Sequence, residues 1–301
     1  MQTKLKKIKL KGNESFNFRE GWLRKGMRCV EKDPAFFSRS DVMEQLGVGS
    51  KMVKSIKYWL LATKLCEEKY VNSGRGRALY LTDDFGKIIS EKDPYFDDIF
   101  TLFLLHYQIV ANADLCIVWN IFFNEFSGVE FARENMIEIC SENLQKKMEE
   151  GVTYSASLFS DDCSSVLRMY QTLEVEDPEE NLQCPLNTLG LIMRGSAAKN
   201  VFNKTAPIKG ALDKMAVLYV ILKNLPEDKN SVGISELISA SNNVGKVFNL
   251  NRIQINEYLD QLRIAGYVNI NRTAGLDMVY LNYDGSPADM LAEYYNKAQM
   301  R

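Results

Sequence analysis

The sequence predicts a mostly α-helical protein with small β wings. Three observations support this fold class: a helix-turn-helix pattern followed by a Gly-rich hairpin, a long apolar helical middle, and a second helix-and-hairpin order near the C-terminus. We expect a winged helix-turn-helix domain over residues 1–92, a helical domain over 93–205 and a second winged-helix-like domain over 206–301. A chain of 301 residues that is 46% hydrophobic has enough length for two or three such domains.

The first helix pair is predicted from its boundaries. Ser40 can cap a short amphipathic helix with Asp41 in its first turn, and Gly47 can take the left-handed conformation that ends it. After the Gly-Val-Gly turn, Ser50 can cap the second helix. A helix pair joined by such a short turn is typical of nucleic-acid-binding domains.

The second helix has two different faces. At about 100° per residue, one half of the helical wheel is mainly apolar: Met52, Val53, Ile56, Trp59, Leu60 and Thr63. The opposite half is polar, and the predicted DNA contacts of this helix are Lys51, Lys54, Ser55, Lys57 and Tyr58. One face is therefore expected to pack while the other reads DNA.

Two strand-like runs follow within residues 66–81, and a Gly-rich turn joins them. Arg75 and Arg77 lie at this turn, so the hairpin is predicted to be a wing that contacts the DNA backbone. The alternative is a winged helix that contacts proteins and carries ordinary solvated lysines, because fold alone does not settle function.

The middle of the chain is predicted to be helical after the break at Asp93-Pro94. Its most apolar stretch, residues 99–110, is about half the roughly 20 residues that a membrane-spanning helix needs. It is therefore read as a buried helix. Asp161 and Asp162 precede an apolar run and are read as residues at the start of a helix.

The C-terminal part repeats the first architecture in outline. Helices are expected over residues 212–222, 234–240 and 252–264, followed by a hairpin over 267–281. The charges on the third helix cancel, so this module is expected to be a weaker DNA reader and a better candidate for a protein-facing or structural role. Arg272 in the hairpin is a candidate phosphate contact.

Charge is distributed unevenly along the chain. Residues 1–90 hold 19 Lys and Arg against 10 Asp and Glu, and residues 91–301 hold 18 against 29. The basic part includes an N-terminal arm with Lys4, Lys6, Lys7, Lys9 and Lys11. This asymmetry indicates that one part meets a polyanion and the rest meets protein. The alternative for the arm is a solvated terminus or part of a first strand.

Cysteine and histidine usage limits the possible chemistry. The six cysteines have no two-residue spacing and are expected to be reduced, because no secretory signal is present and the protein is expected in the cytoplasm, without a membrane anchor. The single histidine leaves too few ligands for a zinc finger, a His-rich metalloenzyme site or a paired-histidine nuclease motif.

Several short motifs resemble one known family, the SspB-like proteins of domain-of-unknown-function family 4007, which occur in bacterial DNA phosphorothioation gene clusters. The motifs run over nearly the whole chain: Asn13-Glu14-Ser15-Phe16 with Arg19, Gly21-Trp22-Leu23, Leu46-Gly47-Val48-Gly49, Met52-Val53, Ser55-Ile56, Tyr58-Trp59, Asp93-Pro94-Tyr95, Leu104-Leu105-His106-Tyr107 and Thr273-Ala274-Gly275-Leu276. The resemblance implies a protein that nicks double-stranded DNA and works with a cysteine desulfurase and an ATP pyrophosphatase.

The same resemblance implies a candidate catalytic site. Glu14 and Arg19 carry the opening motif, and a nickase would use Mg²⁺ or Mn²⁺ held by carboxylates. The other reading of Glu14 and Arg19 is a buried ion pair that holds the arm. The family motif usually has histidine where this chain has Asn13, and a neutral amide cannot accept a proton near neutral pH.

Two other functions stay open from the sequence. One is a non-enzymatic adaptor that binds DNA and docks the sulfur-transfer proteins through its acidic regions. The other is a winged-helix transcriptional regulator, for which sequence-specific operator binding and a dimer are expected.

Overall fold

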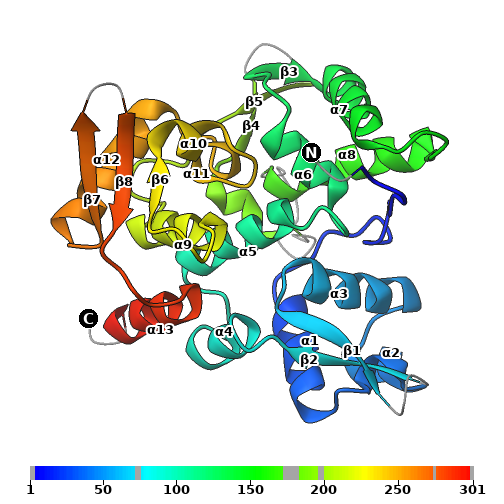
Figure 1. Cartoon of the computed structure of the whole chain (residues 1–301). Coiled ribbons are helices and arrows are strands. Elements are labelled where there is room, and N and C mark those ends of the chain that lie inside the picture. The colour runs from blue at the N-terminus through cyan, green and yellow to red at the C-terminus, as the bar shows by residue number, and fades with distance from the viewer. Residues whose placement is uncertain (1–3, 72–75, 172–182, 196–199, 274–275, 299–301) are drawn as a thin grey trace. The chain divides into compact units, whose positions relative to one another are not determined.

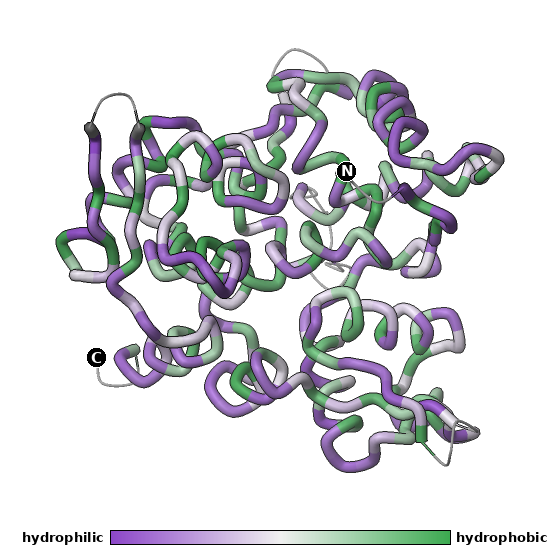
Figure 2. The backbone as a smooth tube through the Cα atoms, in the orientation of Figure 1, coloured by the Kyte–Doolittle hydropathy of each residue, from purple (hydrophilic) through white to green (hydrophobic). Residues whose placement is uncertain are grey.

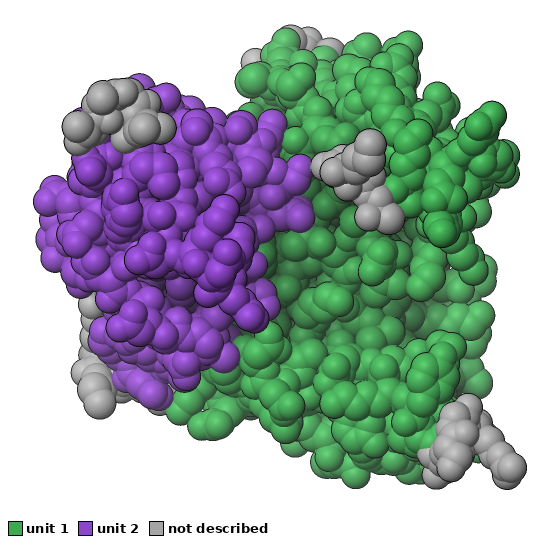
Figure 3. All heavy atoms as spheres, viewed as in Figure 1, with its two compact units in different colours: residues 1–205 green, residues 206–301 purple. Residues whose placement is uncertain are grey.

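A computed structural model of the chain describes residues 4–71, 76–171, 183–195, 200–273 and 276–298 (Figure 1). It is mostly helical with small antiparallel sheets, as the sequence predicts. The chain forms two compact units, Met1–Thr205 and Ala206–Arg301 (Figure 3). The expected division into three domains, with boundaries after residues 92 and 205, stays a prediction.

The first part of the first unit contains a helix pair and a hairpin. Its elements are α1 (Trp22–Lys32), a 3-10 turn at Phe36–Ser38, α2 (Val42–Leu46), α3 (Ser50–Ala62), β1 (Cys66–Val71), β2 (Gly76–Leu81) and α4 (Gly86–Lys92). The two strands pair antiparallel, with Cys66 opposite Leu81 and Val71 opposite Gly76. Arg75 lies outside the described residues.

The ends of α2 and α3 are partly as predicted. Gly47 ends α2 in the left-handed conformation, with φ 67°, so that prediction is confirmed. The predicted serine caps are wrong. Asp41 is the N-cap of α2, and its carboxylate binds the Arg39 guanidinium instead of a backbone N–H. Gly49 is the extended N-cap of α3, which places Ser50 inside the first helical turn.

The second part of the first unit is built around a buried helix. The elements are α5 (Ile99–Ala111), α6 (Ile117–Asn124), β3 (Glu130–Ala132), α7 (Arg133–Lys147), α8 (Ala156–Tyr170), a 3-10 turn at Pro185–Leu189, β4 (Ile192–Arg194) and β5 (Val201–Lys204). Every residue of α5 from Phe100 to Val110 is buried, which confirms the reading of this apolar stretch. Figure 2 colours the backbone by the hydropathy of each residue. None of the helices in the described ranges has both the length and the apolar character that crossing a membrane requires.

The start of α8 differs from the prediction. Ser155 caps the helix by accepting a hydrogen bond from the Leu158 amide at 3.4 Å, so the helix begins at Ala156. Asp161 and Asp162 therefore lie in its second turn. A serine several residues upstream can supply the cap, and Phe159 extends the buried face toward the N-terminus.

The first unit also contains a three-stranded sheet, with strand order β3-β5-β4. Lys204 on β5 donates hydrogen bonds to the backbone carbonyls of Phe122, Phe123 and Phe126. The oxygens of Phe122 and Phe123 lie at the C-terminal end of α6 and that of Phe126 lies just after it. Carbonyls at a helix end have no partner within the helix, and a cation there interacts favourably with the helix dipole. The lysine thus joins the sheet to α6.

The second unit contains α9 (Lys214–Asn224), β6 (Ser231–Gly233), α10 (Ile234–Ser239), α11 (Val244–Val247), α12 (Arg252–Ile264), β7 (Val268–Thr273), β8 (Leu276–Leu281) and α13 (Pro287–Ala298). The predicted helix over 252–264 is confirmed, and a reciprocal capping box between Asn251 and Gln254 starts it. Strand β6 joins the predicted hairpin to give the order β6-β8-β7. Neither β6 nor α13 was expected from the sequence.

Candidate nucleic-acid interface

Two lysines of α3 lie on an exposed face. Lys51 is exposed and makes no ion pair with the described residues. The Lys54 side chain is 69% exposed, and its ammonium lies 3.7 Å from Glu14 Oε1. A contact of this length between exposed groups is weak. Both lysines can therefore reach a phosphate without breaking a close ion pair.

Ser55 and Tyr58 do not lie on that face, and the prediction that they contact DNA does not fit their placement. Ser55 is fully buried, and its hydroxyl donates a hydrogen bond to the Phe16 carbonyl at 3.0 Å. The Tyr58 hydroxyl donates to the Leu115 carbonyl at 2.8 Å. The N-terminal segment covers one flank of α3 and the chain before α6 covers another, so both hydroxyls are used inside the protein.

Lys57 and Arg77 share one carboxylate. Glu68 on β1 lies 2.7 Å from the Lys57 ammonium and 2.8 Å from the Arg77 guanidinium, so it connects the hairpin to α3. Burial alone would raise the pKa of Glu68, but hydrogen bonds and charge from Lys57 and Arg77 outweigh burial and lower it. A DNA phosphate would have to compete with Glu68 for these two cations.

The opening family motif forms a tight turn fixed by Asn13. Glu14 and Ser15 have φ of 50° and 68°, which non-glycine residues rarely adopt. The Asn13 side-chain oxygen accepts a hydrogen bond from the Ser15 amide at 3.1 Å, and its amide group donates to Ser165 Oγ at 3.3 Å. Asn13 is only 1% exposed. Its amide therefore has a structural role that explains its place in the motif without any proton transfer.

Gly12 lies directly against the Tyr58 ring. A Cβ added at this position would lie 2.5 Å from Cε2 of the Tyr58 ring. Because the Tyr58 hydroxyl is held by Leu115, the ring cannot move away freely. The motif thus packs directly against the flank of α3.

Glu14 and Arg19 are not brought together. Glu14 lies beside Lys54, whereas the Arg19 guanidinium lies 5.2 Å from the centre of the Trp22 ring. Arg19 lines a cavity of about 260 Å³ together with Glu20, Tyr95 and Asp97, and Glu14 is not among its lining residues. The expected ion pair between Glu14 and Arg19 does not form in this structure.

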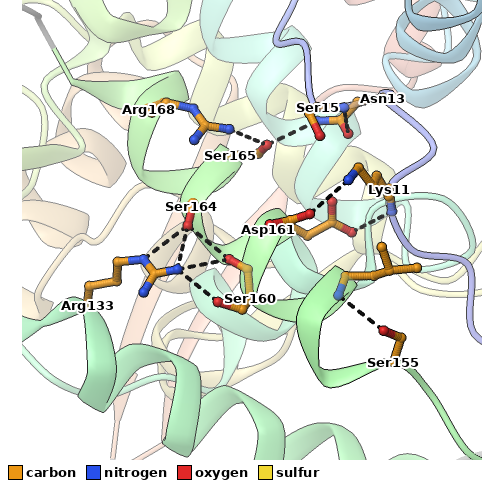
Figure 4. Close-up of polar contacts among 12 residues, drawn as sticks. Lys11, Asn13, Ser15, Arg133, Ser155, Ser160, Asp161, Ser164, Ser165 and Arg168 are labelled. Carbon is orange, nitrogen blue, oxygen red and sulfur yellow. Dashed lines mark hydrogen bonds and ion pairs between the residues drawn. The ribbon is translucent and has the colours of Figure 1, made fainter. Parts of the chain in front are cut away.

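A polar cluster fastens the N-terminal arm to α8 (Figure 4). The Lys11 ammonium pairs with Asp161 at 2.9 Å, and the Lys11 backbone amide donates to Asp162 Oδ2 at 2.9 Å. Asn17 donates to the Ser165 carbonyl at 3.0 Å. Sequence reasoning missed this cluster. The available signal was the position of Asp162, which falls in register with the buried residues Phe159 and Val166.

The two aspartates of this cluster have opposite electrostatic properties. Burial raises the pKa of Asp162 to about 6, although the Lys11 amide hydrogen bond partly offsets the effect. Asp161 is half exposed, and the hydrogen bond and charge of Lys11 lower its pKa. Asp162 is thus a buried carboxyl that loses its proton with difficulty, and Asp161 is an ordinary ion-pair partner.

The described residues contain no group of three or more His, Cys, Asp or Glu side chains arranged to hold a metal ion. Mg²⁺ often uses only one or two carboxylates and completes its shell with water and substrate phosphates. A complete protein cage for the expected Mg²⁺ or Mn²⁺ is therefore not found in the described part of the chain.

Comparison with known families gives a match over most of the chain. The family model described as "Protein of unknown function (DUF4007)" matches residues 10–295. The chain belongs to the DUF4007 family. No curated protein matches it.

Solved structures share the fold of this DUF4007 chain. One is described as "Magnesium ion-bound SspB crystal structure", with a TM-score of 0.85, 22% identity, and coverage of 98% of this chain and 90% of the other. A second, described as "SspB crystal structure", has a TM-score of 0.85, 21% identity, and coverage of 99% and 91%. The likeness extends over essentially the whole fold.

We expect Asp162→Asn to stabilise the protein at neutral pH. A raised pKa in the folded state means that the favourable contribution of protonated Asp162 is complete below its ordinary pKa of 3.8 and is lost as the pH rises through about 6. Asparagine keeps an acceptor for the Lys11 amide without the buried charge. The gain in free energy of unfolding above pH 6 should be on the order of 2 kcal/mol and should fade below pH 4.

Urea unfolding of both proteins over this pH range measures the difference. Asp161→Asn is the matched control, and it should have the opposite sign, because it removes an ion pair that is formed above pH 4. A stability difference for Asp162→Asn that does not change with pH would contradict the assignment of a buried, charge-penalised carboxyl.

Proposed function

We propose that this protein is the DNA-binding component of a bacterial DNA phosphorothioation and defence system. The observation that carries the proposal is the match of one chain, over nearly its full length, to both the DUF4007 family and the SspB fold. The system would include a cysteine desulfurase and an ATP pyrophosphatase, and the acidic remainder of the chain, which carries 29 Asp and Glu in residues 91–301, is the proposed docking region for them in the cytoplasm.

The proposed DNA-binding domain is residues 1–92, with α2 and α3 as the helix pair of a winged helix and β1 and β2 as its wing. Lys51 and Lys54 are the proposed main phosphate contacts because both are exposed and neither has a close ion pair among the described residues. Lys57 and Arg77 would contribute by exchanging Glu68 for a DNA phosphate. Arg75 stays a proposed contact of the DNA backbone. Ser55 and Tyr58 are not proposed as DNA contacts, because their hydroxyls are used inside the protein.

The proposed activity is metal-dependent nicking of one DNA strand, with Glu14 as the candidate carboxylate. Two observations support it: a structural relative is described as bound to magnesium, and Glu14 lies beside Lys54 on the proposed DNA face. Phosphodiester hydrolysis commonly uses a metal ion to activate water and neutralise developing charge. Arg19, the other residue that the resemblance implies, lies over Trp22 and not beside Glu14, so it is not proposed as a partner of Glu14 in this step.

A second candidate function is a non-enzymatic adaptor that delivers DNA to the sulfur-transfer proteins. It is favoured by Asn13, whose amide is buried and holds the turn where the family motif usually has a histidine. A protein of this kind would bind DNA without cutting it.

Lys51→Ala with Lys54→Ala should weaken DNA binding for all sequences. The slope of log affinity against log salt should become shallower by about 0.9 for each phosphate that the variant no longer neutralises. Fluorescence anisotropy with one duplex at several salt concentrations measures both effects. Arg252→Ala with Arg263→Ala, which removes two positive charges from α12, should leave the slope unchanged, and an unchanged slope in the α3 variant would refute the assignment.

Nicking is tested on supercoiled plasmid with Mg²⁺ or Mn²⁺. We expect open-circle product with the wild-type protein, and its loss with EDTA and with Glu14→Gln, whereas Glu20→Gln serves as a control that removes an exposed carboxylate of the Arg19 cavity. Intact plasmid with a normal gel shift would overturn the nickase and favour the adaptor. Absence of both nicking and DNA binding would overturn the proposed function altogether.

A further inference from the structure

Two arginines on the α7 and α8 side of the first unit are held by serine hydroxyls. Arg133 Nη2 donates to Ser160 Oγ and to Ser164 Oγ, each at 2.8 Å, and Arg133 Nε donates to Ser164 Oγ at 3.0 Å. Arg168 Nη2 donates to Ser165 Oγ at 3.1 Å. Figure 4 shows the two guanidinium groups on one side of α8 with Ser164 between them.

Serine hydroxyls orient these guanidinium groups but do not neutralise them. The carboxylate paired with Arg133 is Glu134, at 3.9 Å and on a side chain that is 72% exposed, so the pairing is weak. Arg168 makes no salt bridge with the described residues. An oriented arginine without a close carboxylate keeps its charge available to a ligand.

Asp161 is a carboxylate that three neighbouring cations share. Its close partner is the Lys11 ammonium at 2.9 Å, and the charges of Arg168 and Arg133 also act on it and lower its pKa. Asp162 is buried beneath the arm and accepts a backbone hydrogen bond instead. Asp161 therefore pairs closely with Lys11 alone and acts on Arg133 and Arg168 only through charge at longer range.

Both arginine side chains reach the surface, although burial around the Arg168 guanidinium lowers its pKa. The Arg133 side chain is 37% exposed, and Arg168 is exposed. A planar guanidinium presents parallel N–H groups that match the oxygens of a phosphate. Side chains that are already oriented before binding reduce the entropy that ligand binding must overcome.

We propose that Arg133 and Arg168, oriented by Ser160, Ser164 and Ser165, form a binding site for a single phosphate group. This site is built on α7 and α8 and is additional to the lysines of α3. The phosphate would be a phosphodiester of a DNA strand or free inorganic phosphate. Binding of a DNA phosphodiester at this site rests on the proposed function, whereas binding of free phosphate does not.

The first experiment titrates inorganic phosphate into the full chain at low salt and follows the arginine Nε–Hε signals by NMR. We expect saturable shifts of two signals, assigned by Arg133→Lys and Arg168→Gln. Asp161→Asn should tighten phosphate binding severalfold because it removes the competing anion. Chloride at equal ionic strength is the control.

The second experiment measures DNA affinity against salt for Arg133→Gln with Arg168→Gln. Lys146→Gln with Arg263→Gln is the matched control, since it removes two exposed charges elsewhere. A DNA phosphate in the site predicts that the salt slope becomes shallower, by about 0.9 for each phosphate no longer neutralised, in the first pair alone. Thermal unfolding checks each variant, and Arg168→Gln alone, which changes an exposed side chain, carries the test if the double variant does not fold.

The outcomes separate this inference from the proposed function. Saturable NMR shifts with phosphate, together with an unchanged DNA salt slope in the arginine variant, support the site with free phosphate as its ligand. If the titration gives no saturable shift and the DNA salt slope does not change, the site is overturned. DNA binding by α3 is unaffected by that outcome. A wild-type protein that binds no DNA would overturn the proposed function, and the phosphate titration would then decide the site by itself.

Discussion

The structure of the first unit depends on one backbone oxygen, the carbonyl of Phe16. It accepts hydrogen bonds from Ser55 Oγ at 3.0 Å and from the Trp59 indole at 2.8 Å. Trp59 is fully buried and makes edge contacts with Phe18 and Trp119. Because leaving buried polar groups unpaired costs about 1–3 kcal/mol each, the N-terminal segment cannot leave α3 without a substantial loss of stability.

This junction determines which residues can act together. The segment that supplies Phe16 also supplies Lys11 and Asn13, which bind α8. The exposed lysines of α3 and the serine-held arginines are therefore parts of one compact unit. A partner with repeated negative charges, such as a DNA strand, can engage both groups at once if their spacing suits its phosphates.

The sequence predicted the positions of several helices well, but not all of their caps. Helices with clear periodicity and caps, such as the one over 252–264, appear as expected, because their signals lie within a few residues. The helical wheel of α3 predicted that Ser55 and Tyr58 lie on its exposed face. Their hydroxyls instead bind Phe16 and Leu115, which are distant in the sequence and which a helical wheel does not include. A helical wheel assumes one packing face, and α3 is covered on more than one.

The candidate site was predictable only in part for the same reason. A local sequence pattern can identify exposed lysines on a helix that follows a short turn. Lys51 and Lys54 were identified as candidate DNA contacts in this way. The fork of Arg133 depends on Ser160 and Ser164, which belong to another helix. Only the packing of α7 against α8 brings these residues together, and no short-range signal encodes it.

Hydrogen exchange of the full chain with and without duplex DNA, at low salt, tests the central claim most directly. The account predicts slower exchange in α3, since DNA phosphates would bind its lysines, and also in α8 when a DNA phosphate occupies the arginine site. Slower exchange confined to α12, β7 and β8 would contradict it, because DNA would then bind the second unit instead of the first.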